Sequence, residues 1–195
     1  MAYKNKLAAK SAFSLVELLV AISLLSIITL IIGYVFISHF KLFNNVKSLV
    51  EVSSSNKLVL DELITQIREG EAIVNTCTGC GTYLTGSGTL ILQLWPLDSN
   101  NVPFEPSSNN YDYVIYSQDP SKTTNLLKIT VPDTTSNRTA STKIMASDIS
   151  NLNFTYNNGN PTLANEVTVS VQNSIQITGR VQTTSQQVKA VLRNR

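Results

Sequence analysis

The sequence has little charge, one histidine and two cysteines. Charged residues make up 14% of its 195 residues and the formal net charge is +2, which does not favour broad nucleic-acid binding. The single histidine, His39, excludes a Ser-His-Asp or Cys-His pair in the region after it. Neither a G-x-x-x-x-G-K-[ST] nor a G-x-G-x-x-G motif is present. We therefore expect no enzyme activity, no cofactor, no metal site and no nucleic-acid partner.

Charge is absent altogether from Leu18 to Ile37, a run dominated by Leu, Ile and Val. Twenty residues of helix span about 30 Å, which matches the hydrocarbon core of a bilayer. A leader with Lys4, Lys6 and Lys10 and no acid precedes the run, so the N-terminus should stay cytoplasmic. The small-residue site Ser11-Ala12 comes before the run rather than after it. An ordinary signal peptidase would therefore leave the apolar segment in the protein.

Proline and glycine are absent from His39 to Arg68, which favours a helix that continues beyond the membrane. Apolar residues recur there at spacings of three and four. Glu69-Gly70 predicts the stop, so one helix should run from Phe13 to about Glu69. The polar stretch from Ser53 to Asn56 is expected to bend or loosen it. The apolar positions that we expect to lie on a soluble domain are Phe43, Val46, Val50, Leu60, Ile64 and Ile67.

After Gly70 the pattern changes to short alternating segments with turn residues between them. One face of the resulting sheet should pack on the helix and the other should face water. Asn173-Ser174 is a candidate tight turn between the last two strands. We predict loops at 72–88 and 96–110, the second exposed. The candidate strands are 89–95, 111–117, 126–131, 152–157, 166–172 and 175–184.

The segment Phe13-Ser-Leu-Val-Glu17-Leu-Leu-Val-Ala-Ile22, behind its basic leader, resembles the N-terminus of type IV prepilins and type II secretion pseudopilins. By position, the resemblance implies cleavage between Ala12 and Phe13 and N-methylation of Phe13. It also implies that Glu17, the fifth mature residue, pairs in a filament with the free amine of a neighbouring subunit's Phe13. A carboxylate inside an apolar segment is costly unless it is paired. The family usually has Gly where this chain has Ala12, which is also small.

Three weaker motifs resemble the PilW and pseudopilin J branch of this family, namely segments 111–116, 149–156 and 191–195. Many major pilins have a helix-breaking Pro where this chain has Tyr34, which favours a minor pilin. The resemblance implies an α+β, pilin-like fold with a long N-terminal α-helix, half transmembrane, packed on an antiparallel β-sheet domain.

The expected domains are a leader at 1–12, a transmembrane half-helix at 13–37, an amphipathic half-helix at 38–70 and a soluble β-rich domain at 71–195. The implied function is a minor pilin or pseudopilin that initiates or caps a filament from the bacterial inner membrane, with its soluble domain periplasmic or extracellular. The implied partners are a prepilin peptidase that is also a methyltransferase, other pilin subunits and membrane lipid. The alternative is a pilus-tip binding module, an adhesin or a DNA-uptake receptor, anchored by the same helix.

Other polar and aromatic groups have simpler interpretations. The spacing Cys77-x-x-Cys80 favours a small loop disulfide in an exported domain, with free thiols as the alternative. The stretch from Asp98 to Asn101 fits a polar turn better than a calcium site. Aromatic residues in strands are more often core than a ligand-binding patch; those considered are Trp95, Phe104, Tyr111, Tyr113 and Tyr116.

Overall fold

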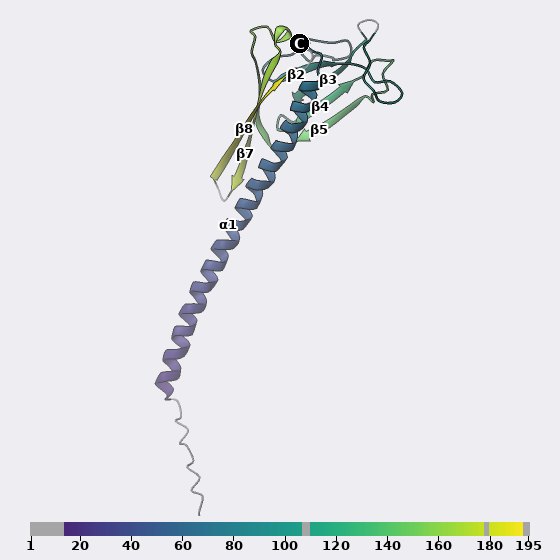
Figure 1. The fold of residues 1–195 in the computed structure, drawn as a ribbon. Coiled ribbons are helices and arrows are strands. Elements are labelled where there is room, and N and C mark those ends of the chain that lie inside the picture. The colour runs from purple at the N-terminus through teal and green to yellow at the C-terminus, as the bar shows by residue number, and fades with distance from the viewer. Residues whose placement is uncertain (1–13, 107–109, 178–179, 193–195) are drawn as a thin grey trace, which may run out of the picture. The chain divides into compact units, whose positions relative to one another are not determined.

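The protein is described by a computed structural model that covers residues 14–106, 110–177 and 180–192 (Figure 1). The chain divides into two compact units, with the boundary between Lys47 and Ser48. The first unit contains the start of helix α1 (Leu15–Glu69), and the second contains the rest of this helix and all the strands. The predicted α+β class, a long N-terminal helix followed by antiparallel sheet, is confirmed.

Helix α1 is unbroken from Leu15 to Glu69. It continues through Ser53–Asn56, where we expected a bend or a looser stretch, and Gln186 Nε2 donates a hydrogen bond to Ser53 Oγ at 2.9 Å. Gly70 follows the helix, and its amide donates to the Ile67 carbonyl at 3.2 Å. A Cβ atom at Gly70 would lie 3.0 Å from Leu192 Cδ2. This close approach explains why the chain turns away from the helix at a glycine.

One face of the second half of α1 is buried. Its buried residues recur with the period of a helix surface, at Asn56, Val59, Leu60, Leu63 and Ile67. The predicted positions Leu60 and Ile67 belong to this stripe, and Ile64 packs against the core. The other three predicted positions, Phe43, Val46 and Val50, are exposed. For Val50, which lies in the second unit, the prediction that it covers a soluble domain is therefore wrong. For Phe43 and Val46, which lie in the first unit, it stays a prediction.

A five-stranded antiparallel sheet has the strand order β1-β2-β3-β4-β5. Two predicted strands are closely reproduced by β2 and β3, and 126–131 is reproduced by β4. Strands β1 and β5 were missed: β1 lies in a predicted loop, and β5 carries exposed, polar residues that show little alternation. The bounds are β1 Ala72–Ile73, β2 Thr89–Leu94, β3 Asp112–Gln118, β4 Leu126–Val131 and β5 Ser141–Ala146.

A second antiparallel sheet has the order β6-β7-β8, with β6 at Ile149–Tyr156, β7 at Glu166–Ile177 and β8 at Arg180–Val191. A short 3-10 helix, η1 (Pro161–Leu163), precedes β7. The predicted turn at Asn173-Ser174 is wrong, because β7 continues through it and Asn173 pairs with Thr184. The predicted strand 175–184 is wrong for the same reason: it joins the end of β7 to the start of β8.

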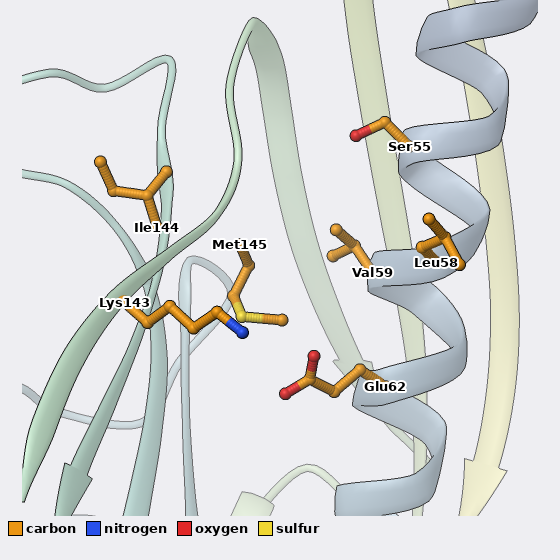
Figure 2. Close-up of a pocket in the computed structure, with 7 residues that line it drawn as sticks. All are labelled: Ser55, Leu58, Val59, Glu62, Lys143, Ile144 and Met145. Atoms are coloured by element: carbon orange, nitrogen blue, oxygen red, sulfur yellow. The ribbon is translucent and has the colours of Figure 1, made fainter.

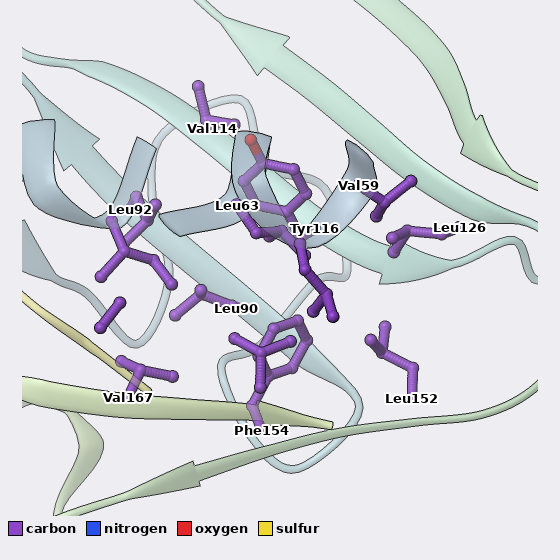
Figure 3. Close-up of a cluster of buried hydrophobic side chains, with 14 of the residues drawn as sticks. Val59, Leu63, Leu90, Leu92, Val114, Tyr116, Leu126, Leu152, Phe154 and Val167 are labelled. Atoms are coloured by element: carbon purple, nitrogen blue, oxygen red, sulfur yellow. The ribbon is translucent and has the colours of Figure 1, made fainter. Parts of the chain in front are cut away.

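The main core lies between the buried stripe of α1 and the inner faces of both sheets. Figure 3 shows Leu63 and Tyr116 at its centre, with Leu90 and Phe154 beside them. All four side chains are at most 1% exposed. The Tyr156 hydroxyl joins β6 to the other sheet, because it contacts the carbonyl of Thr89 in β2 at 3.3 Å and the carbonyl of Gly86, before β2, at 3.0 Å.

The opposite face of the five-stranded sheet has a small core of its own. Ile91 and Ile115 point there, and Cys80 covers them, with the partly buried Cys77 and Tyr83 packed alongside. Because of this loop, β2 and β3 are buried on both faces. We expected this face to meet water, and at the central strands that expectation is wrong.

Candidate functional site: the start of helix α1

The first turn of α1 is closed by a reciprocal pair of hydrogen bonds between Ser14 and Glu17. Ser14 Oγ accepts from the Glu17 amide at 3.2 Å, and Glu17 Oε2 accepts from the Ser14 amide at 3.3 Å. This arrangement is a capping box, in which two amides without a partner inside the helix are satisfied by side chains. The signal for it, Ser-x-x-Glu before an apolar run, is visible in the sequence, and our sequence analysis missed it.

Glu17 is exposed and stands at the positive end of the helix dipole. Its carboxylate is therefore placed where the backbone favours a negative charge, and it also accepts from Ser14 Oγ at 3.4 Å. The acid thus has a local role within one chain, in addition to any role between chains.

From Leu15 to Lys47 every large apolar side chain of α1 is exposed, with Leu15 and Phe36 among the most exposed. Three hydroxyl groups in this segment form their hydrogen bonds within the helix. Ser23, Ser26 and Thr29 each donate to the backbone carbonyl four residues earlier, at 2.8 Å. A bilayer requires such internal pairing. By length and composition, α1 is the one candidate membrane span among the described residues.

Ala12 and Phe13, the predicted cleavage and methylation residues, lie outside the described residues. Ser14 follows Phe13 directly, so the capping box begins one residue after the predicted mature N-terminus. The pair between Glu17 and a neighbouring Phe13 amine joins two chains and stays a prediction.

Cys77 and Cys80 are joined by a disulfide. Gly79 (φ +87°) and Gly81 (φ +61°) adopt left-handed backbone conformations that let the loop turn tightly around it. The Cys80 side chain is buried against Ile91 and Ile115, so the disulfide fastens the loop that covers the second face of the sheet. That this domain is exported, which was the premise of the disulfide prediction, stays a prediction.

The other candidate sites are structural. Asp98 Oδ1 accepts from the amides of Asn100 and Val102, both at 2.8 Å, so this stretch is a polar turn. Tyr116 is a core residue and Phe104 lies at the surface, so the aromatic residues do not form one patch. In the described ranges no three His, Cys, Asp or Glu side chains are grouped as metal ligands.

A buried carboxylate that sequence reasoning missed holds the loop after β4. Asp112 is fully buried and accepts from Arg138 Nε at 2.8 Å, from Ser136 Oγ at 2.7 Å and from the Asp133 amide at 2.8 Å. These donors satisfy the carboxylate, so its burial is explained without a ligand. The donor residues lie more than twenty positions from Asp112 in the sequence, so no local motif predicts this cluster.

A comparison with known protein families identifies a motif in the N-terminal segment of the chain. The family described as "Prokaryotic N-terminal methylation motif" matches residues 7–33. The chain therefore carries a prepilin-type methylation motif. The match supports a type IV pilin-like protein, indicates a prepilin peptidase substrate that assembles with other pilins, and, with the apolar helix, agrees with inner-membrane anchoring. No curated protein matches the chain.

Proposed function

We propose that the chain is a minor pilin or pseudopilin that helps to initiate or cap a type IV pilus or a type II secretion pseudopilus. In this proposal it is cleaved between Ala12 and Phe13, N-methylated on Phe13, and inserted with its N-terminus cytoplasmic and residues 71–195 on the other side. The observation that carries the proposal is Glu17. It is an exposed acid in the first turn of a helix whose apolar side chains are also exposed, and it lies inside the matched methylation motif.

The capping box gives Glu17 a state that suits the isolated subunit. Before assembly, Ser14 donates to its carboxylate and no buried charge is left unsatisfied. On assembly, the carboxylate exchanges this contact for the positively charged amine of a neighbouring Phe13. That amine is otherwise unfavourable at the positive end of a helix dipole. In this proposal the exchange neutralises the amine and the carboxylate with each other inside the apolar surroundings and fixes the axial register of the subunits.

Processing is tested first by the intact mass and N-terminal sequence of protein recovered from membranes that contain an active prepilin peptidase. We expect a chain that begins at N-methylated Phe13. A chain that still carries residues 1–12 under these conditions would overturn the filament proposal and leave a membrane-anchored domain.

Assembly is tested with Glu17→Ala, with Asp61→Asn as the control because Asp61 is another exposed carboxylate on α1. Glu17→Ala should leave cleavage and membrane insertion intact and should reduce incorporation into sheared filaments at least about tenfold, the equivalent of about 1.4 kcal/mol. The control should assemble normally. Normal incorporation of the Glu17 variant would remove the charge pair from the proposal.

A further inference from the structure

Two cavities lie end to end along one face of α1, beside β5 and the turn that follows it. The first has a volume of about 170 Å³ and lies between α1 and β5, as Figure 2 shows. The second has a volume of about 270 Å³ and lies between α1, Ser147-Asp148 and Asn173. Ser55 lines both. We call the two together the β5 groove, and all its residues belong to the unit that begins at Ser48.

The first cavity opens at the edge of the five-stranded sheet. Lys143, Ile144 and Met145 all line it, although consecutive side chains of a strand point to opposite faces. Figure 2 shows Lys143 and Met145 extending towards α1 and Ile144 on the other side of the strand. Because residues whose side chains point to opposite faces all line the cavity, we take the cavity to extend along the outer edge of the strand. Strand β5 is the last strand of the sheet, and within the described ranges no strand pairs with that edge.

The second cavity presents hydrogen-bond acceptors. Glu51 and Asp148 are exposed carboxylates from opposite walls. Asn173 is 2% exposed, and its Oδ1 has no hydrogen-bond partner among the described residues. A buried amide oxygen without a partner is destabilising, because it has lost its hydrogen bonds to water. A donor that enters this cavity would meet two negative charges and lie beside the Asn173 amide.

We propose that the β5 groove binds an extended segment of a partner protein, which adds as a strand to the outer edge of β5 and places a Lys or Arg side chain between Glu51 and Asp148. Backbone hydrogen bonds to β5 supply the common part of such binding, and side-chain pockets supply its selectivity. Leu58 and Ile144, 70% and 56% exposed, provide apolar contact along the segment.

The chemistry of the groove favours this occupant over others. A helix cannot pair with a strand edge, because its backbone groups are already bonded within it. A calcium ion takes six to eight oxygen ligands, with several carboxylates among them. This cavity offers two carboxylates beside neutral amide and serine groups, and no cluster of three His, Cys, Asp or Glu side chains occurs in the described ranges. A Lys or Arg side chain has several N–H donors and can therefore bond to the separate acceptors of Glu51, Asp148 and Asn173 better than a single ion can. The inference does not depend on the role of Glu17.

The test uses the full chain in lipid nanodiscs and a phage-displayed library of random eight-residue peptides. Selection is run in parallel on three proteins: the unaltered chain, the double variant Glu51→Gln with Asp148→Asn, and a charge-matched control, Asp61→Asn with Glu105→Gln, whose sites lie outside the groove. Asn tolerates the left-handed backbone at residue 148 (φ +61°). Equal thermal midpoints show that all three proteins are folded.

We expect enriched peptides with alternating apolar and polar residues and a Lys or Arg near one end. A synthetic copy should bind the unaltered and control proteins equally and the double variant at least about tenfold more weakly, the equivalent of about 1.4 kcal/mol. Replacement of its Arg by citrulline should weaken binding to the same extent. Alternate backbone N-methylation, which removes donors and keeps the charge, should abolish it.

Hydrogen exchange measured by mass spectrometry locates the contact. Bound peptide should slow exchange across Ser141–Ala146 and leave β8, the edge of the other sheet, unchanged. A selection that enriches nothing, enriches peptides without a basic residue, or enriches peptides that bind the double variant equally would overturn the inference. Unchanged exchange in β5 would overturn it as well.

Discussion

The two halves of helix α1 share one backbone and differ in what their side chains meet. From Leu15 to Lys47 the apolar side chains are exposed on every side of the helix. From Ser48 to Glu69 burial is confined to one stripe, whose centre is Leu63. A helix that is apolar all round belongs in lipid or in a large core, whereas a stripe belongs on a soluble surface. A large apolar side chain therefore stabilises the unit that begins at Ser48 only when it lies on the buried stripe in the second half of the helix.

The strongest way to break this comparison is a matched pair of leucine truncations. Leu63→Ala removes a fully buried side chain and should lower the free energy of unfolding of the unit that begins at Ser48 by about 2–5 kcal/mol, because it leaves a cavity. Leu25→Ala removes a side chain that is 69% exposed and should leave that free energy unchanged. Denaturant unfolding in detergent, followed by Trp95 fluorescence, measures both.

Alkaline pH should also separate the halves. Burial, reinforced by the Glu62 and Glu69 carboxylates, raises the pKa of the Tyr116 phenol above its ordinary value of 10.0, and burial raises the pKa of Tyr156 as well. The folded domain therefore holds protons that the unfolded chain releases, so this stability is complete below about pH 10 and is lost as pH rises above it. The loss is at most about 1.4 kcal/mol per pH unit for each tyrosine.

Circular dichroism and tyrosine absorbance should show the sheets unfolding while the apolar half of α1 stays helical. Tyr116→Phe is the matched variant, because the Tyr116 hydroxyl has no hydrogen-bond partner among the described residues. It should move the alkaline midpoint upward at little loss of stability at pH 7. An unchanged midpoint would remove Tyr116 as a cause.

Asn56 offers a smaller test in the opposite direction. It lies in the buried stripe at 0% exposure, and neither its Nδ2 nor its Oδ1 has a partner in the described part of the chain. Asn56→Leu replaces it with an apolar side chain of similar size and should raise the free energy of unfolding by about 1–3 kcal/mol. A decrease would show that the amide has a function in the fold that its contacts do not reveal.

The smallest expected difference is between two glutamates. Glu62 pairs with Lys128 at 2.7 Å, and both side chains are partly exposed, so Glu62→Gln should lower domain stability by no more than about 1 kcal/mol. Glu17→Gln should leave domain unfolding unchanged, because its contacts lie within the first turn of α1. A domain destabilised equally by both changes would contradict the division of the helix.

Local signals predicted the helix and most strands. Unbroken helical residues up to Glu69-Gly70 fixed the end of α1, and alternation located β2, β3 and β4. Alternation did not predict β5, because most of its residues are exposed and the strand depends on its pairing with β4. Asn173-Ser174 has turn composition, yet twelve residue pairs between β7 and β8 override it.

The features of the candidate sites also fall into those that a contiguous segment predicts and those that depend on the tertiary fold. Glu17 and Phe13 stand out because the methylation motif is contiguous in sequence, and the Ser14 cap could have been predicted from the same segment. The spacing of Cys77 and Cys80 predicted a loop disulfide from the sequence, but the packing of this loop on Ile91 and Ile115 depends on the tertiary fold. The Asp112–Arg138 pair and the β5 groove join segments that are distant in sequence, so no pattern in a single stretch predicts them.

The late start of burial in α1 has a calorimetric consequence. Unfolding raises heat capacity mainly by exposing apolar surface to water, and the exposed residues before Ser48 contribute little to that change. At about 12–15 cal/mol/K per residue, residues 48–192 imply roughly 2 kcal/mol/K, against roughly 2.6 kcal/mol/K for the whole chain. Calorimetry should therefore give a heat-capacity change of unfolding about a quarter smaller than the length of the sequence implies. The free energy of unfolding should depend on temperature with a correspondingly smaller curvature.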